Sequence, residues 1–365
     1  MKVIILIYVH GFKGDETTFS AFPSDIQQCL TNIYPSSELA IRTVIYPPYE
    51  TKGELSSAVT SLLNFTEATV IDAEVALGTP SPVVTPAVGV VFVAHSMGGL
   101  VVTDATLQIL ARDRAVLFPK ITGILCYDSP FLGLHSSVFA QDVLSRGTAK
   151  FNELKGLGAA IPVSAVTSFL FAQKSSEQPS REGKTEKKQV NWGKVAGLTA
   201  AGIATTAAAA AGTAWYLKSQ NVDVNWAKDH LLFVGALFQK PQILKDRLWT
   251  LYQARLRIRM INYYTLINQK KDEFSNDSQQ KDPTVVMKGI GKLMSGEGDG
   301  TRTFCNVPKE APYTEFFVPT ENPLAKGEIE AHVNIFEQSK NPNYQSLVGE
   351  SVERISGYIN DWINA

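Results

Sequence analysis

The stretch VVFVAHSMGG, residues 90–99, joins an apolar run to a sharp, glycine-rich turn. β-branched and aromatic residues dominate the run, which predicts a buried strand over Val90–Ala94. The turn has the pattern of a G-x-S-x-G elbow with Ala94 in its first position. Small residues around Ser96 let strand and helix approach each other while the hydroxyl stands clear. Ser96 is therefore the candidate nucleophile and the Met97 N–H a candidate oxyanion donor, unless the serine only caps a helix.

The order of apolar run, turn and helical pattern recurs through the first third of the chain. Strands are predicted at Val3–Val9, Ile41–Tyr46, Val90–Ala94 and Ile121–Tyr127. Helices are predicted at Ser20–Ile33, Lys52–Ala76 and Gly99–Arg112. Strands that alternate with helices imply right-handed crossovers, which predicts an α/β fold with a mostly parallel sheet flanked by helices.

The later part of the chain departs from this order. Helical patterns are predicted at His230–Phe238 and Ile243–Arg255, and apolar side chains recur every three or four residues from Val348 to Trp362, as on one helix face. Further strands are predicted at Arg257–Ile267 and, as the last strand, Arg302–Val307. We therefore expect a core of residues 1–134 and 255–365 with a large helical insertion, a lid or cap, at 135–254.

Charge and cysteine content exclude several classes of protein. Lys+Arg 34 against Asp+Glu 35 gives a net charge of −1, which provides no basic surface for nucleic acid. The three cysteines are too scattered for a disulfide framework or a metal site, and they suit a reducing compartment. Val3–Val9 is too short for a signal peptide and has no cleavage motif after it. We expect an intracellular, cytoplasmic protein without a metal.

A second candidate oxyanion donor follows the first predicted strand. The sequence there is His10-Gly11-Phe12. Gly11 permits a close approach of the backbone, and the loop after an early strand is where the other donor is expected. The Phe12 N–H is therefore predicted to complete the oxyanion hole with Met97.

The candidate base is His332, in the segment EIEAHVNIF. It alone of the five histidines lies after the last predicted strand and before the final helix. The chain order serine, acid, histidine predicts the base at that position. Imidazole accepts and returns a proton near neutral pH, as the role requires.

Two aspartates are candidates for the acid that orients the base. Asp128 ends the fourth predicted strand, and Asp272 follows the Arg257–Ile267 strand. Asp128 is preferred, although an aspartate before Ser-Pro can also bind its own turn. The sequence leaves both aspartates open as the acid.

In combination, these segments resemble the lipase-like serine esterases of the α/β-hydrolase superfamily. The residues that match are HGF at 10–12, AHSMGG at 94–99, DSPFLG at 128–133 and AHVNIF at 331–336. DSPFLG is similar to the T-P-H-x-G turn of that family but has Phe131 where relatives often have histidine. The resemblance implies an α/β-hydrolase-like fold, ester hydrolysis, often of lipids, and no cofactor.

The insertion contains an uncharged segment of unusual composition. Val195–Leu217 has ten alanines, three glycines and four threonines. A helix of this length could cross a bilayer, but small residues favour insertion little and suit close helix packing. A buried or lid helix is favoured, interfacial membrane contact ranks second, and a membrane span ranks third.

The leading functional hypothesis is a serine hydrolase that cleaves carboxylic esters through an acyl-enzyme. The catalytic residues would be Ser96, His332 and Asp128, and the substrate a small-molecule ester or, given the insertion, a lipid-like acyl ester. Under this hypothesis, residues 195–217 would make peripheral contact with a membrane. The competing hypothesis is an inactive pseudo-hydrolase that acts as a membrane-associated interaction module.

Overall fold

The computed structural model describes residues 1–12, 14–35, 37–49, 55–112, 116–135, 138, 241–268 and 301–364. All of them belong to one compact unit, which spans Met1–Leu144 and His230–Ala365. A second unit, Ser145–Asp229, lies outside the described residues, as do the segment Val195–Leu217 and the candidate acid Asp272. In the part of the chain that is described, no helix is both long enough and apolar enough to cross a membrane.

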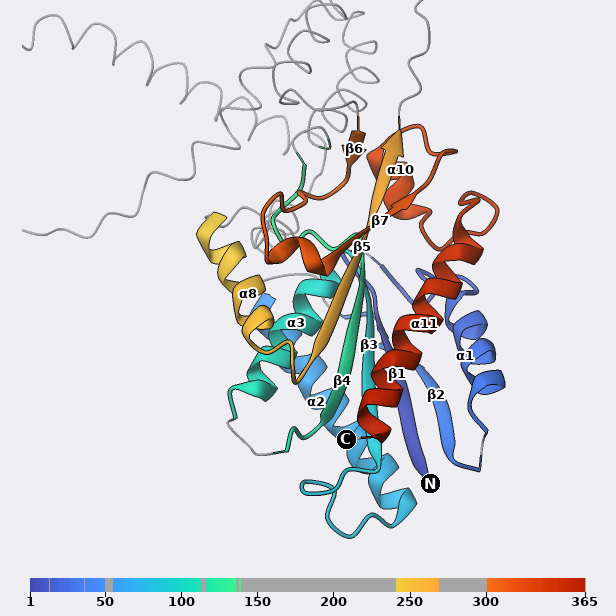
Figure 1. Ribbon diagram of the computed structural model, residues 1–365, viewed down its shortest axis with the longest axis vertical. Helices are drawn as coiled ribbons and strands as arrows, with labels where there is room; N and C mark the ends of the chain where they lie inside the picture. The colour runs from blue at the N-terminus through green and yellow to red at the C-terminus, as the bar shows by residue number, and fades with distance from the viewer. Residues whose placement is uncertain are drawn as a thin grey trace, which may run out of the picture. The chain divides into compact units, whose positions relative to one another are not determined.

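A seven-stranded sheet forms the centre of the fold (Figure 1). Its order is β2-β1-β3-β4-β5-β6, and β7 pairs with β5 as well. All pairings are parallel except that of β6 with β5. The strands are β1 (Lys2–Val9), β2 (Leu39–Ile45), β3 (Val88–His95), β4 (Lys120–Tyr127), β5 (Arg259–Asn268), β6 (Thr301–Thr303) and β7 (Phe317–Glu321).

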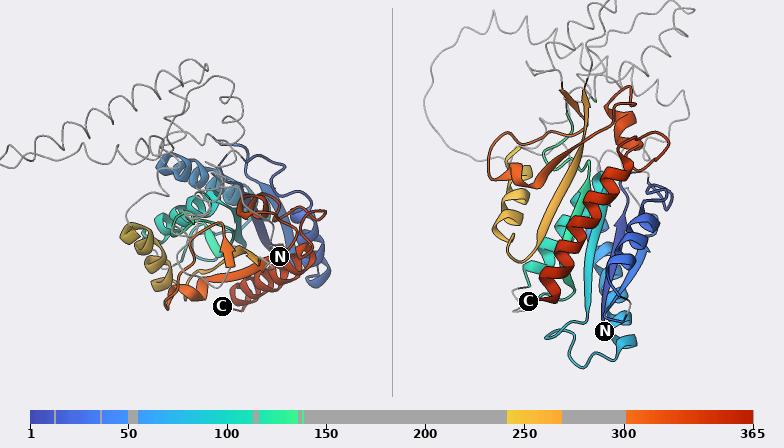
Figure 2. Two further views of the ribbon diagram at one scale, coloured as in Figure 1. Left: turned by 90° about the horizontal axis from the view of Figure 1, so that it is seen from above. Right: turned by 45° about the vertical axis from the view of Figure 1, so that its right-hand side comes forward.

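Helices cover both faces of this sheet (Figure 2). They are α1 (Phe22–Ile33), α2 (Leu55–Leu77), α3 (Met97–Leu110), α8 (Pro241–Gln253), α10 (Glu328–Val333) and α11 (Tyr344–Ile363), with a short 3₁₀ turn η2 at Tyr313–Phe316. Alternate residues of β1 enter different cores: Ile5 lies in the cluster with α2 and α3, and Ile4 in the one with α1 and α11. The predicted α/β class, a mostly parallel sheet flanked by helices, is confirmed.

The central strands are apolar on both faces because each face is covered. β3 is buried along its whole length, and β1 and β4 are buried except at their first residues. In the strand register, Val9 pairs with Ala94 and His95 with Tyr127. The carboxyl ends of β1, β3 and β4 therefore meet at one edge of the sheet, where the residues after each strand come together.

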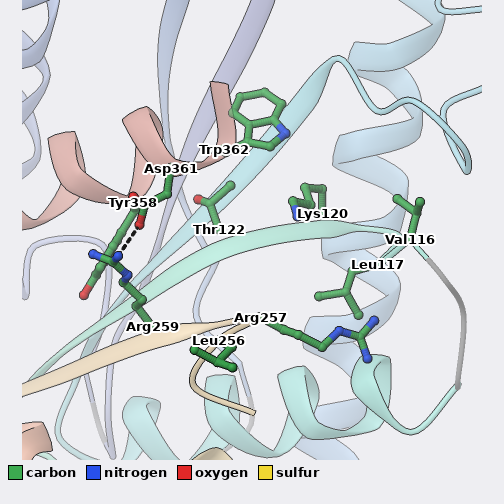
Figure 3. Close-up of a pocket in the computed structure, with 10 residues that line it drawn as sticks. All are labelled: Val116, Leu117, Lys120, Thr122, Leu256, Arg257, Arg259, Tyr358, Asp361 and Trp362. Carbon is green, nitrogen blue, oxygen red and sulfur yellow. Dashed lines mark ion pairs between the residues drawn. The ribbon is translucent and has the colours of Figure 1, made fainter. Parts of the chain in front are cut away.

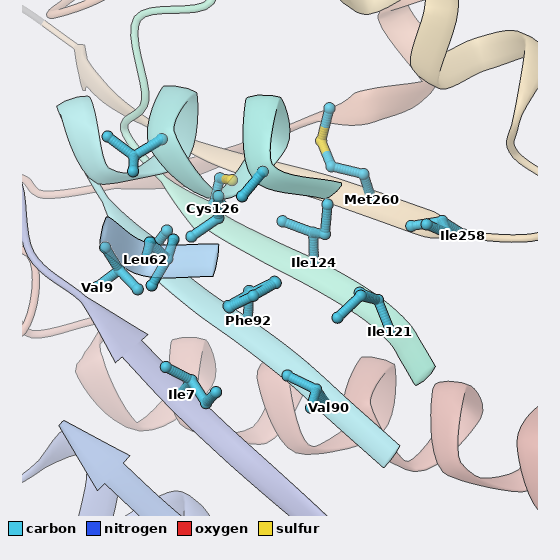
Figure 4. Packing of buried hydrophobic residues seen from close by; sticks show 14 of the residues in the cluster. Ile7, Val9, Leu62, Val90, Phe92, Ile121, Ile124, Cys126, Ile258 and Met260 are labelled. Atoms are coloured by element: carbon cyan, nitrogen blue, oxygen red, sulfur yellow. The ribbon is translucent and has the colours of Figure 1, made fainter. Parts of the chain in front are cut away.

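The core between the sheet and α2, α3 and α8 is the one drawn in Figure 4. Leu248 and Leu251 of α8 are buried in it, and Arg247 makes two hydrogen bonds to Asp104 of α3, at 2.6 and 2.9 Å. The predicted insertion, 135–254, includes α8. The structure places this helix against α3, as part of the layer that covers the sheet.

The end of the sheet differs from the prediction. The predicted last strand, Arg302–Val307, is a short antiparallel strand at Thr301–Thr303, and β7 follows it. β7 contains Pro319 in an edge position, so its sequence resembles a loop. The six-residue helix α10 was not predicted either, because so short a helix has no periodic pattern of apolar residues.

Candidate active site

Ser96 occupies the turn between β3 and α3. Its φ and ψ are 54° and −129°, a strained conformation for a residue with a side chain. The Ser96 N–H donates to the Tyr127 carbonyl at 2.9 Å, which ties the turn to the end of β4. A Cβ on Gly98 would overlap the carbonyl oxygen of Val9. The small residue at 98 therefore lets α3 begin directly against β1, as a nucleophile elbow requires.

The loop after β1 lies against this elbow. A Cβ on Gly11 would lie 2.7 Å from the Ser96 Cβ and 3.1 Å from the Met97 nitrogen. No side chain fits there, so the backbone immediately before Phe12 touches both the candidate nucleophile and a candidate oxyanion donor. The two segments expected to form the oxyanion hole are thus neighbours.

His10 and Tyr49 hold that loop. The His10 Nδ1–H donates to the Gly11 carbonyl at 3.0 Å, and the Tyr49 hydroxyl donates to the His10 carbonyl at 2.8 Å. The two rings stack with centroids 4.9 Å apart. Burial lowers the pKa of His10 below its ordinary value of 6.5, so the ring is neutral at pH 7. His10 therefore acts as a neutral support for the loop.

The structure brings Asp128 and His332 together. The His332 Nδ1–H donates to Asp128 Oδ2 at 2.9 Å. Thr265 donates to the same carboxylate twice, from its backbone N–H at 3.1 Å and its hydroxyl at 2.6 Å. The Cys305 thiol donates a fourth, weaker hydrogen bond, at 3.7 Å. Because Asp128 is fully buried, these donors are what makes its burial tolerable, and they fix its orientation.

The thiol of Cys305 is suited to donate rather than to react. Burial, and next the negative charge of Asp128, raise the pKa of Cys305 well above its ordinary value of 9.0. It therefore keeps its proton at physiological pH.

The ring of His332 is held between two others. His95 stacks on one side with centroids 4.5 Å apart, and Phe304 stacks on it at 3.5 Å. The His95 Nε2–H also donates to the backbone carbonyl of His332 at 3.1 Å. Since His95 directly precedes Ser96, the same short segment carries the candidate nucleophile and positions the candidate base.

A buried ion pair anchors the helix that carries His332. Glu328 lies one turn before His332 on α10 and is fully buried. Arg302 donates to both of its oxygens, from Nε to Oε1 at 2.7 Å and from Nη2 to Oε2. Arg302 is two residues from Phe304, so one segment both anchors α10 and stacks on its histidine.

The turn at 128–133 is braced from β5. The Asn262 side chain accepts from the Ser129 N–H and donates to the Ser129 carbonyl, both at 3.0 Å. Gly133 has a φ of 85°, a backbone conformation that favours glycine. Phe131 is fully buried in the core.

The predicted site residues thus fall into two connected groups. Ser96, Met97 and Phe12 form the elbow and its neighbouring loop, and Asp128 and His332 form a hydrogen-bonded pair. His95 links the groups. Within the described residues, no hydrogen bond joins Ser96 Oγ to His332, and no three histidine, cysteine, aspartate or glutamate side chains converge as metal ligands do.

Sequence reasoning missed the residues that support the pair. Thr265 had a detectable signal, because it is a polar residue within an apolar strand, as is Asn262. No sequence signal marks Cys305, Phe304 or His95, because their roles depend on contacts between distant segments.

No protein-family model matches the chain, and the comparison with curated proteins finds no match. Solved structures that match the chain include a lipase, a thioesterase domain and a phospholipase. The lipase BlEst2 of Bacillus licheniformis is 12% identical, with a TM-score of 0.37, over 94% of this chain and 91% of that one. The thioesterase domain from the curacin biosynthetic pathway is 12% identical, with a TM-score of 0.29, over 95% and 90%.

The phospholipase PlaB from Legionella pneumophila is 14% identical, with a TM-score of 0.28, over 39% of this chain. The match spans 29% of PlaB, so this chain covers less than a third of that protein.

The buried His95 leads to an expected pH dependence of stability. The pKa of His95 lies well below 6.5, mainly because the ring is buried and secondly because His332 is its neighbour. As the pH falls through 6.5, the unfolded chain therefore binds more protons than the folded one. The free energy of unfolding should therefore decrease toward acid, by up to about 1.4 kcal/mol per pH unit for one histidine. Urea unfolding at pH 7 and pH 5.5 should show a smaller decrease for His95→Gln, which keeps an N–H donor. Equal decreases would contradict this assignment.

Proposed function

We propose that the protein is a serine hydrolase that cleaves carboxylic esters, with Ser96, His332 and Asp128 as its catalytic residues. The observation that carries the proposal is the hydrogen bond from His332 Nδ1 to the buried Asp128, beside the strained turn at Ser96. An imidazole that donates from Nδ1 has its Nε2 lone pair available to accept a proton.

In the proposed reaction, Ser96 Oγ attacks the ester carbonyl carbon while His332 Nε2 takes the serine proton. The N–H groups of Phe12 and Met97 stabilise the oxyanion that forms. Collapse of this intermediate breaks the bond to the alcohol, which leaves with the proton from His332, and an acyl-serine remains. Water then adds in the same way and releases the acid. Asp128 keeps the imidazole oriented throughout, and the reaction needs no cofactor.

Lipid-like acyl esters are the proposed substrates. Besides the predicted insertion, the support is apolar surface beside the base: Ile329 and Val333 of α10 are 36% and 63% exposed. Val333 directly follows His332, so an acyl chain near the site could cover these side chains. Activity against p-nitrophenyl esters should then increase from acetate to decanoate, and a decrease would favour small soluble esters.

The direct test is labelling by a fluorophosphonate probe, which reacts only with an activated serine. The wild-type protein should be labelled, and Ser96→Ala should not. An unlabelled wild-type protein would instead support an inactive hydrolase fold that serves as a membrane-associated interaction module.

Gly11→Ala should impair the oxyanion hole. The new methyl group would press on Ser96 and displace the loop that carries Phe12, and loss of one oxyanion donor lowers kcat by about 10²–10³-fold. Gly349→Ala on α11 is the matched control, because nothing lies within 4 Å of its Cβ position. We expect wild-type kcat for the control on a p-nitrophenyl ester. Equal kcat values for Gly11→Ala and the wild type would remove Phe12 from the mechanism.

A further inference from the structure

Figure 3 shows a pocket, whose volume is about 290 Å³. Ser96 follows the end of β3 and the pocket lies at the start of the parallel strand β4, so the two are at opposite ends of the sheet. It is formed by the first residues of β4 and β5 and the last turn of α11. Lys120 opens β4 and Asp128 follows its end, so at ~3.3 Å per residue the pocket is about 25 Å from the catalytic residues. A ligand bound there would not touch the candidate active site.

Lys120 is the decisive residue of the pocket. Its side chain is partly buried, and within the described residues it forms no ion pair or hydrogen bond. Burial, and next the nearby cations Arg257 and Lys2, lower its pKa below the ordinary value of 10.5. A half-buried ammonium group among like charges is unfavourable unless an anion joins it.

The other charges do not neutralise Lys120. Arg257 and Arg259 also line the pocket, with Asp361 as the one carboxylate among its lining residues. Asp361 already pairs with Arg259 at 2.7 Å (Figure 3). Lys2 lies close by, with its ammonium 4.7 Å from the centroid of the Trp362 ring. The lining thus holds three cationic side chains and one carboxylate, and that carboxylate is paired with Arg259 rather than with Lys120.

Most of the remaining lining is apolar or aromatic. Val116, Leu117, Leu256 and the rings of Tyr358 and Trp362 belong to it, and Thr122 adds one uncharged polar side chain. Leu256 is 92% exposed, so the pocket has an apolar side chain at its rim that a ligand could cover. The pocket volume is close to about 300 Å³, which is the lower limit of the usual range for small-molecule sites.

We propose that this pocket binds a small amphiphilic anion, a carboxylate with a short alkyl chain, whose charge pairs with Lys120 and whose chain lies on the apolar walls. A bare inorganic anion would leave the apolar walls uncovered, and a neutral lipid would leave the ammonium unpaired. The proposal does not depend on the activity of Ser96.

Calorimetric titration of the full chain with sodium octanoate tests the site. Lys120→Gln should weaken octanoate binding by at least about tenfold, since hydrogen bonds to charged groups contribute at that level. Lys120→Arg, which keeps the charge, should bind within about threefold of the wild type, and Lys340→Gln, at an exposed lysine, should bind as the wild type does. Without ligand, Lys120→Gln should unfold at a higher temperature, because a half-buried charge beside other cations has been removed.

Equal octanoate affinity in wild type and Lys120→Gln would overturn the proposal, and so would no binding to either. Binding of n-octanol as tight as that of octanoate would show that the charge is not recognised. Binding of inorganic phosphate but not octanoate would refute the amphiphilic ligand. Octanoate should also protect Lys120 of the wild type, but not Lys340, from acetylation by acetic anhydride. Equal protection of the two lysines would contradict binding at this pocket, and this measurement needs only the wild-type protein.

Discussion

Ser96→Ala is expected to lower kcat for ester hydrolysis by about 10⁶-fold, the magnitude typical of a triad nucleophile. The fold should persist, because the substitution removes one hydroxyl at a turn and opens no cavity in the core. Steady-state kinetics on a p-nitrophenyl ester, together with urea unfolding of the same preparations, measures both effects. A purified variant with activity within tenfold of the wild type would remove Ser96 from the mechanism.

His332 extends this experiment into a double-mutant cycle. His332→Ala should be as damaging as Ser96→Ala, and the double variant scarcely worse, because nucleophile and base act as one unit. Additive losses would show that the two residues do not act together. Since the ring of His332 stacks on His95 and Phe304, this variant should also lose some stability, so its folding must be followed in parallel.

Asp128→Asn is expected to lower kcat by about 10⁴-fold. The carboxylate accepts from His332, Thr265 and Cys305, and an amide presents a donor in place of one acceptor oxygen. The imidazole would then be held with its proton on Nε2, where it cannot receive the serine proton.

Asp272→Asn is the matched control for this prediction. It removes a carboxylate of the same type, and its kcat should be close to that of the wild type. The reverse pattern would transfer the orienting role to Asp272. If Asp128→Asn and Asp272→Asn both had the kcat of the wild type, neither aspartate would be the acid.

The long apolar strands could be predicted from sequence because burial on both faces imposes uninterrupted apolar runs. The predicted bounds of β3 and β4 differ from the observed ones by no more than two residues. β7 was missed because Pro319 sits in it and its exposed residues alternate with half-buried ones. Its pairing with β5 supplies the stability that its own composition lacks.

The candidate site was predictable only where local chemistry fixes it. A nucleophile elbow needs small residues around Ser96, and chain order points to His332. Both Asp128 and Asp272 follow strands, so the sequence leaves the acid open; of the two, Asp128 lies among the described residues, where it accepts a hydrogen bond from His332. The hydrogen bonds of Asp128 to Thr265 and Cys305 join residues 137 and 177 positions apart, and no local pattern reports such contacts.

The location of Asp128 has a consequence for how this chain can vary in evolution. Asp128 follows β4 and Ser96 follows β3, so the ladder that pairs His95 with Tyr127 sets their relative placement. β5 contributes a hydrogen-bond donor, Thr265, from within the strand rather than a reactive group from the loop beyond it. In the proposed mechanism no catalytic residue comes from the segment between β5 and β6, so we expect homologous chains to vary in its length and composition without loss of activity.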